Sequence, residues 1–138
     1  MTSQSITLPA GTYYVGDPSA VFSREDWREL CRQTRDFTAG GPLFEFRGAR
    51  MVVAPVRSGD GIYADSDDGV YSVGSGLIGI TPQALSSVSP LEPCGSGGRW
   101  EDALQSLEVS VFTSQIVVNV DGTHSFSIAL EETSAIGE

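Results

Sequence analysis

Lysine is absent from this chain, and its eight basic residues are all arginine. Asp and Glu number 18, which leaves a formal net charge of −10 at pH 7. A field of this sign repels nucleic-acid phosphates and anionic membrane surfaces, so it disfavours a general nucleic-acid binder and binding to a membrane surface. The acidic balance is typical of a soluble protein, and it also suits docking to a basic partner or mimicry of nucleic-acid charge.

Cysteine and histidine are scarce as well. Cys31 and Cys94 are too few for a disulfide framework and have no metal-binding spacing, so we expect reduced thiols in a cytoplasmic protein. His124 is the only histidine, which excludes any site that needs two His ligands and leaves one candidate base for Ser–His or Cys–His catalysis. We therefore expect no metal site and no cofactor.

Long apolar runs are also missing. No stretch approaches the roughly 18 residues that a membrane-spanning helix needs, and residues 1–8 lack the pattern of a secretory signal. The 138 residues are 40% hydrophobic and 19% charged, which is a globular balance at the usual length of one domain. We expect residues 1–138 to form a single domain that has no membrane contact.

Glycine, by contrast, is plentiful, with 16 residues. The glycines separate short runs rich in Val, Ile, Tyr and Phe, as turns separate the strands of successive hairpins, and Asp121-Gly122 is the strongest hairpin signal. Strands are predicted at residues 6–8, 12–15, 43–46, 50–56, 61–64, 70–73, 77–80, 109–112, 116–120 and 125–130. The first two are expected to pair around Pro9-Ala10-Gly11 and the last three to form a meander, while residues 86–98 are expected to form a long exposed loop.

Two segments have helical spacing instead. Behind Ser23, which can cap a helix, four residues share one helical face: Trp27, Leu30, Cys31 and Thr34. The same spacing recurs at Trp100, Ala103, Leu104 and Leu107. We therefore predict an α+β domain with a mainly antiparallel β-sheet or partly open barrel. Two short helices, over residues 23–35 and 100–107, pack on it and largely bury Trp27 and Trp100.

The first predicted helix also carries half of the chain's arginines on one face: Arg24, Arg28, Arg32 and Arg35. Two interpretations stay open. The arginines can pair with acidic residues of the same helix on a solvated face. They can also form an electropositive stripe that holds a phosphate or a carboxylate-rich partner through bidentate contacts. We take this stripe as the candidate ligand-binding or partner-binding site.

Asp17 is a further candidate binding residue. It precedes Pro18 at the end of a predicted strand, where an Asp usually makes a local hydrogen bond in a turn. Strand ends also present functional carboxylates, so both interpretations of Asp17 stay open.

Acidic residues also cluster around one predicted turn: Asp60, Asp65, Asp67 and Asp68. The order Asp65-Ser66-Asp67-Asp68-Gly69 resembles a calcium loop, but it is one residue too short and Ser75 stands where the closing Glu would be. The pattern predicts an acidic hairpin turn that needs no metal. No phosphate loop, serine nucleophile elbow or zinc-protease motif accompanies it.

The segment Leu8-Pro9-Ala10-Gly11-Thr12-Tyr13-Tyr14-Val15-Gly16-Asp17-Pro18 resembles the start of a loosely defined family of short, uncharacterised proteins from bacteriophages, prophages and bacteria. Family members also have a helix with a Trp, here Trp27, a Gly-Asp-Gly-x-Tyr hairpin, here residues 59–63, and a Gly-x-Ile-Gly strand, here residues 76–79. They commonly have Cys-Tyr where this chain has Ser19-Ala20, which argues against a thiol enzyme. The resemblance implies a compact β-rich fold and suggests a phage origin, but it implies no activity.

These observations favour a non-enzymatic binding protein of phage or prophage type. It would inhibit or sequester a host component, either a defence protein or a small anionic signalling molecule. The alternatives are an immunity protein that neutralises a basic toxin, a structural part of a virion, and a small hydrolase or lyase that uses Asp17, Asp60 or Asp65 with an arginine clamp. The sequence leaves the identity of the partner and a homo-oligomeric state open.

Overall fold

The computed structural model describes residues 4–35, 42–56, 60–67, 69–88 and 98–131. In chain order the elements are β1 (Gln4–Gly16), η1 (Pro18–Ala20), α1 (Arg24–Thr34), β2 (Leu43–Phe46), β3 (Ala49–Pro55), β4 (Gly61–Ala64), β5 (Val70–Val73), β6 (Leu77–Pro82), η2 (Gln83–Leu85), β7 (Arg99–Val111), β8 (Gln115–Val120) and β9 (His124–Ala129), where η marks a short 3-10 turn. None of the described helices is long and apolar enough to span a membrane.

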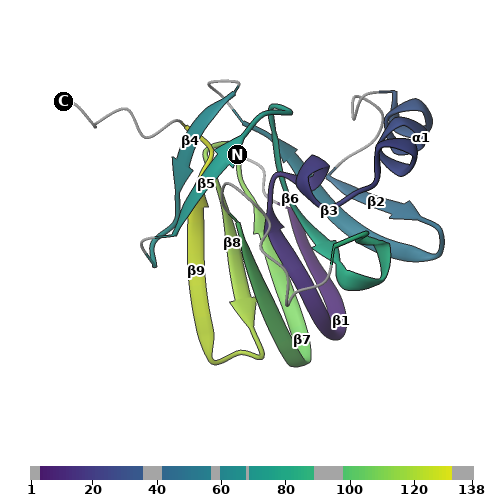
Figure 1. Cartoon of the computed structure of the whole chain (residues 1–138). Helices are drawn as coiled ribbons and strands as arrows, with labels where there is room; N and C mark the ends of the chain where they lie inside the picture. The colour runs from purple at the N-terminus through teal and green to yellow at the C-terminus, as the bar shows by residue number, and fades with distance from the viewer. Residues whose placement is uncertain (1–3, 36–41, 57–59, 68, 89–97, 132–138) are drawn as a thin grey trace.

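Seven strands form one open antiparallel sheet in the order β2-β3-β6-β1-β7-β8-β9, and β4 and β5 form a separate hairpin. The hairpin lies against the β9 end of the sheet, where Asp65 forms an isolated bridge with Ile128 (Figure 1). The protein is therefore a β-rich α+β domain, as the sequence predicts.

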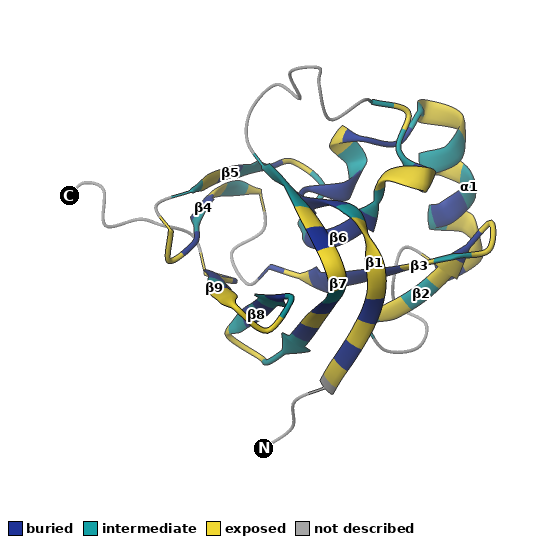
Figure 2. Ribbon diagram, turned by 90° about the horizontal axis from the view of Figure 1, so that it is seen from below, coloured by how far each residue is buried: buried dark blue, intermediate teal, exposed yellow. Residues whose placement is uncertain are grey.

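The sheet has a hydrophobic core on each face. Side chains alternate along a strand, so Val52 and Ala54 of β3 enter the larger core, while Met51 and Val53 enter the smaller one. The larger core also holds the inward residues of β7, β8 and β9, and Figure 2 shows the matching alternation of buried and exposed residues along β1. The smaller core is covered by Val21 and Phe22, which link η1 to α1, and by Leu30 of α1. This packing places α1 beside β2 and β3 (Figure 1).

The first predicted helix is confirmed as α1. The Ser23 hydroxyl accepts a hydrogen bond from the Asp26 N–H at 3.1 Å, which caps the first turn. Leu30 and Thr34 are buried against the sheet. Trp27 is partly buried and packs against the smaller core, in line with the predicted burial but short of full burial.

The second predicted helix is wrong, because its residues belong to the long strand β7, which pairs with both β1 and β8. The helical spacing arises where the β1–β7 register shifts between Pro9 and Gly11, since a bulge breaks the two-residue alternation. Leu104 is 83% exposed instead of buried. Trp100 is partly buried and packs against the smaller core, with the centre of its ring 5.2 Å from that of Tyr14.

The segment Pro9-Ala10-Gly11 is not a turn either, because it lies opposite the extra residue of a bulge in β7. Residues 4–16 therefore form one continuous strand instead of the expected opening pair. The predicted strand at residues 109–112 is the end of the much longer β7, and the other predicted strands are confirmed with small differences at their ends. The β8–β9 turn has positive φ at Asp121 and Gly122, as a tight Asp-Gly hairpin requires. Most of the expected loop at residues 86–98, including Cys94, lies outside the described residues.

Candidate functional site

The predicted arginine stripe lies on the solvent side of α1. Arg24, Arg28 and Arg32 are exposed along the helix, and Arg35 is exposed just after its last turn. They stay in water because Leu30 and Thr34 hold the opposite side of the helix against the sheet. The structure thus brings the four predicted arginines to one side of one element.

A fifth arginine joins them from another part of the chain. A hollow of about 440 Å³ lies between α1 and the β2–β3 turn, and Arg47 of that turn lines it together with Arg28 and Arg32. Its other lining residues are Glu25, Glu29, Gln33 and Phe46. We call the exposed set of Arg24, Arg28, Arg32, Arg35 and Arg47 the arginine face. The sequence predicts the turn at Arg47-Gly48, but no sequence signal shows that it packs beside α1.

Arg47 is held in an unusual backbone conformation. Its φ is 54° and that of Gly48 is 83°, a pair of positive angles that tight hairpins normally fill with Asn-Gly. A non-glycine residue in the left-handed region costs about 1–2 kcal/mol. The guanidinium lies 5.0 Å from the centre of the Phe46 ring, and Nη2 lies 2.8 Å from Oδ1 of Asp26.

Arg35 is a second arginine in the left-handed region, with φ 54° at the C-cap of α1. Its N–H donates to the carbonyls of Arg32 and Cys31, which closes the last turn. Glycine or asparagine is the usual residue where a helix ends in this way. The two ends of the arginine face therefore carry arginines where the backbone alone would favour other residue types.

The charges of the arginine face are only partly paired. Nε of Arg32 donates to Oε1 of Glu29 at 3.2 Å, and these two side chains form an ion pair. The hydrogen bonds from Arg32 and Gln33 lower the pKa of Glu29, and the bond to Glu29 raises the pKa of Arg32. Arg24 and Arg28 form no ion pair with any other described residue. The interpretation that the arginines pair with acidic residues of the same helix therefore holds for Arg32, but not for Arg24 or Arg28.

Asp17 lies elsewhere and has a structural set of contacts. Its side chain is 4% exposed and accepts hydrogen bonds from the backbone and hydroxyl groups of Ser19 and Ser75 and from the Gly74 N–H, at 2.7–3.1 Å. These bonds tie η1 to the loop between β5 and β6. The structure therefore does not place Asp17 with the arginines.

Asp65 is the centre of a buried polar cluster that the sequence does not reveal. Its side chain is fully buried, and the carboxylate accepts from the Tyr71 hydroxyl, from the N–H groups of Asp67 and Gly69, and from Nη1 of Arg99 at 3.1 Å. Burial alone would raise the pKa of Asp65, but these hydrogen bonds outweigh it and the pKa lies below its usual value. Burial and the Asp65 charge raise the pKa of Tyr71.

Arg99 extends this cluster toward the end of the sheet. Its Nε lies 2.7 Å from Oε2 of Glu101, and its guanidinium lies 4.1 Å from the centre of the Phe126 ring. Desolvation would lower the pKa of Arg99, but the bonds to Glu101 and Asp65 outweigh it and the pKa is raised. His124 Nε2 lies 2.8 Å from Oδ2 of Asp67 at the exposed edge. These contacts fasten the β4–β5 hairpin to β7 and β9.

Metal ligands do not gather in the part of the chain that the structure describes. No group of three or more His, Cys, Asp or Glu side chains within it could hold a metal ion. Asp65 and Gly69 close the predicted acidic turn through a backbone hydrogen bond of 3.0 Å, and Asp60 is exposed. Asp68 lies outside the described residues.

Comparison with known proteins gives no match to a family model, a curated protein or a solved structure. Function must therefore be inferred from the residues and geometry above.

Proposed function

We propose that this chain is a non-enzymatic binding protein that docks through its arginine face onto an acidic patch of a protein partner. In keeping with the sequence resemblance, the proposed role is that of a phage or prophage protein that inhibits a host protein. The observation that carries the proposal is the backbone of Arg35 and Arg47. Each has a positive φ at a position where Gly or Asn would serve the fold better. Strain of this kind is typically retained where a side chain has a function.

The charged side chains that line the hollow favour binding of a protein surface over binding of a small anion. Its lining combines three arginines with Glu25 and Glu29, and Asp26 contacts Arg47 from the side. A free phosphate compound would meet both glutamates, whose charges oppose its own. A protein surface that carries charges of both signs can match this pattern, because complementary potentials are what orient protein partners.

The exposure of Arg28 and its lack of an ion pair with another described residue support the same conclusion. Arg28 is exposed, lines the hollow and forms no ion pair with another described residue, so its guanidinium is available for a bidentate contact. Arginine is also enriched among the residues that dominate binding energy at protein interfaces. The remainder of the chain is strongly acidic, so it repels acidic partners that approach it elsewhere.

Two of the three carboxylates considered for catalysis, Asp17 and Asp65, have structural hydrogen bonds. Asp17 accepts from five groups of η1 and the β5–β6 loop, and Asp65 accepts from four groups around the β4–β5 turn. A carboxylate whose pKa lies below its usual value, as that of Asp65 does, stays ionised and is a poor proton donor. These contacts favour a binding role over hydrolysis.

The test begins with the identification of the partner. Tagged wild-type chain and the Arg28→Ala/Arg32→Ala variant are expressed in bacteria, and co-purifying proteins are quantified by mass spectrometry. Arg50→Ala, which removes an exposed arginine outside the arginine face, is the control for loss of positive charge. We expect a host protein that is enriched by wild type and Arg50→Ala and lost from the double variant.

The enriched protein is then purified and titrated by calorimetry. We expect the double variant to bind at least ten-fold more weakly, and the wild-type affinity to fall as salt concentration rises, since the contact is between charges. Equal enrichment by all variants, or no enriched protein at all, would contradict the proposed function.

A further inference from the structure

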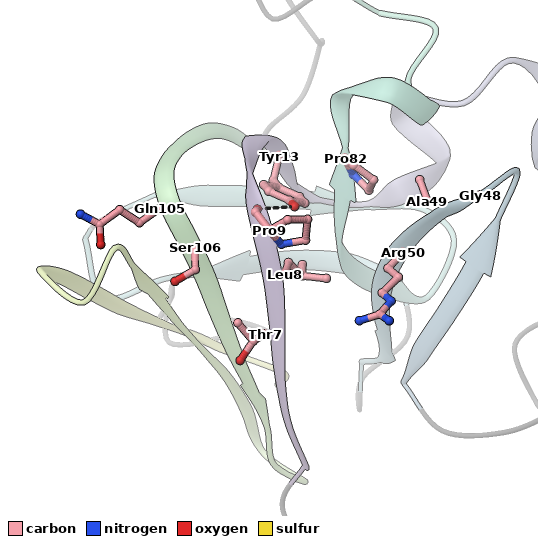
Figure 3. Close-up of a pocket in the computed structure, with 10 residues that line it drawn as sticks. All are labelled: Thr7, Leu8, Pro9, Tyr13, Gly48, Ala49, Arg50, Pro82, Gln105 and Ser106. Atoms are coloured by element: carbon pink, nitrogen blue, oxygen red, sulfur yellow. Dashed lines mark hydrogen bonds between the residues drawn. The ribbon is translucent and has the colours of Figure 1, made fainter.

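The second and larger hollow of the protein lies at a corner of the sheet (Figure 3). β6 ends at Pro82, which pairs with Tyr13 of β1, and β3 begins at Ala49 after the β2–β3 turn. β1 and β7 continue past both of these ends as a pair, as far as Gln4 and Val111. The volume of the hollow is about 660 Å³. We call it the corner hollow, and its lining comes from residues 7–9, 13, 48–50, 82, 105 and 106.

The bulge in β7 forms one wall of the corner hollow. The Asp121 carboxylate accepts hydrogen bonds from the N–H groups of residues 104–106 at 2.7–3.1 Å. These bonds lower the pKa of Asp121, so the carboxylate stays ionised and holds the bulge in place. Gln105 and Ser106 of the bulge line the hollow. Bulges are common beside functional sites, where they redirect side chains, and this one is fixed without any ligand.

The buried part of the lining is apolar. Leu8 and Tyr13 line the corner hollow, and both belong to the larger core. The Tyr13 hydroxyl donates to the Pro9 carbonyl at 2.7 Å (Figure 3). Burial raises the pKa of Tyr13, so the hydroxyl stays protonated and keeps this bond. Pro9, Ala49 and Pro82 add further apolar surface, so the hollow offers a fixed site for an apolar group.

Arg50 is the one charged residue among those that line the corner hollow. Its side chain is exposed and forms no ion pair with any described residue. Glu45 lies directly opposite Arg50 on β2, yet these two side chains do not pair. The Arg50 guanidinium is therefore available to an anion in the hollow.

The backbone of Thr7 supplies a neutral donor on another side of the corner hollow. The Ser106 carbonyl accepts from the Asp121 N–H, so Ser106 and, by alternation, Glu108 direct their backbone groups toward β8. Thr7 lies opposite Glu108, so its N–H and C=O point away from β7. No described residue bonds to them there, because β6 has already ended.

This lining favours a small ligand with one negative charge. The volume falls within the range of about 300–1,000 Å³ that is typical of small-molecule sites. A single arginine balances one carboxylate. A phosphate that carries two charges would keep one of them unbalanced beside apolar groups, in a protein whose net charge is already −10.

We propose that the corner hollow binds a small monocarboxylic acid with a compact apolar body. The carboxylate contacts the Arg50 guanidinium, which can hold both of its oxygens, and the apolar body packs against Leu8, Pro9 and Pro82. The Thr7 N–H can donate to a further polar atom of the ligand. The site does not depend on the arginine face, because the two hollows share no lining residue.

The test is a titration of the isotope-labelled full chain with 3-phenylpropionate, followed through its amide NMR signals. We expect the signals of Thr7, Leu8 and Ser106 to shift, with a Kd of about 1 mM or lower, which a ligand of this size can reach. The neutral analogue 3-phenylpropionamide should bind about ten-fold more weakly or worse, because it lacks the charge that Arg50 contacts. Arg50→Ala should weaken binding of the acid to the same extent, while Arg28→Ala, which changes the arginine face, should leave it unchanged.

Two matched substitutions on β1 test the location of the site. Thr7 and Ser5 are both exposed and lie on the same face of β1, but only Thr7 lines the corner hollow. Thr7→Trp should fill part of the hollow and abolish binding, whereas Ser5→Trp should bind the acid as wild type does. The amide spectra of both variants should remain those of the folded chain, since Trp is well tolerated in strands.

Four results would overturn the proposal. They are the absence of any shift with the acid, equal binding of the acid and the amide, undiminished binding by Arg50→Ala, and undiminished binding by Thr7→Trp. Two further probes address other anions. Inorganic phosphate that binds as tightly as 3-phenylpropionate would show that the apolar lining has no role. An acetylated tripeptide that ends in Phe and binds about ten-fold more tightly than the acid would assign the hollow to the C-terminus of a protein partner.

Discussion

Arg47 and Asp26 form an ion pair, with Nη2 and Oδ1 2.8 Å apart, that joins the β2–β3 turn to the first turn of α1. Exposed pairs of this kind contribute at most about 1 kcal/mol, so the pair does little for stability. It does determine where the Arg47 guanidinium lies, next to the hollow that Arg28 and Arg32 line. The arginine face is thus assembled from two elements that the packing of α1 on the sheet brings together.

The Arg47→Asn substitution distinguishes the effect of Arg47 on the stability of the fold from its effect on partner binding. Asn adopts the left-handed backbone more readily than Arg, so the loss of the ion pair is offset and the melting temperature should stay the same or rise. Affinity for the protein partner should fall. Gly48→Ala is the matched control, because it keeps Arg47 but places a Cβ at φ 83° and should lower the melting temperature. A clear drop in the melting temperature of Arg47→Asn would contradict the account of strain.

Asp65→Asn tests the buried polar cluster. The substitution removes the charge that Arg99 and Tyr71 face, and breaking a buried ion pair typically costs about 3–5 kcal/mol. Chemical denaturation measures the loss. Asp67→Asn is the control: its carboxylate is partly exposed and the loss should stay below about 1 kcal/mol. Similar small losses for both variants would show that the cluster does not hold the β4–β5 hairpin in place.

The same carboxylate predicts a pH dependence of stability. The pKa of Asp65 is lower in the folded protein than in the unfolded chain, where it is about 3.9. Its contribution is therefore fully present above the unfolded pKa and is lost as pH falls through the folded pKa. Between about pH 5 and pH 2 the unfolding free energy of wild type should fall more steeply than that of Asp65→Asn. Parallel pH profiles would contradict this assignment.

Gly79→Ala tests the close approach of β6 and β3. A Cβ at Gly79 would lie 2.5 Å from the Val52 carbonyl oxygen and 3.2 Å from the Val53 side chain, so the strands would have to separate. We expect a loss of about 1–3 kcal/mol in the unfolding free energy, the usual cost of overpacking. Gly74→Ala is the control, since a Cβ there meets nothing within 4 Å. Equal stability of the two variants would show that the β3–β6 spacing differs from that described.

Local signals in the sequence predict the elements whose structure is decided locally. Ser23 and the residues that follow it predict α1, and Asp121-Gly122 predicts the β8–β9 hairpin, because a cap or a turn depends on adjacent residues. The segment around Trp100 is predicted wrongly as a helix, because its pairing with β1 and β8 overrides the apparent helical spacing.

The candidate site is predictable only in part for the same reason. Four arginines share a helix and so share a face, which the sequence shows directly. Arg47 reaches them through tertiary packing, and Arg99 meets Asp65 because β7 runs beside the β4–β5 hairpin.

The most direct test of the central claim is the affinity of the Arg28→Ala/Arg32→Ala variant for the protein partner, measured together with its melting temperature. Both side chains are exposed on α1, so their removal should leave the melting temperature unchanged within the small effect of one exposed ion pair. Charge-assisted contacts at an interface typically contribute about 2–5 kcal/mol, so binding should weaken by a factor of at least ten. Full affinity in a stably folded double variant would contradict the account, and the arginines would then be a solvated helix face.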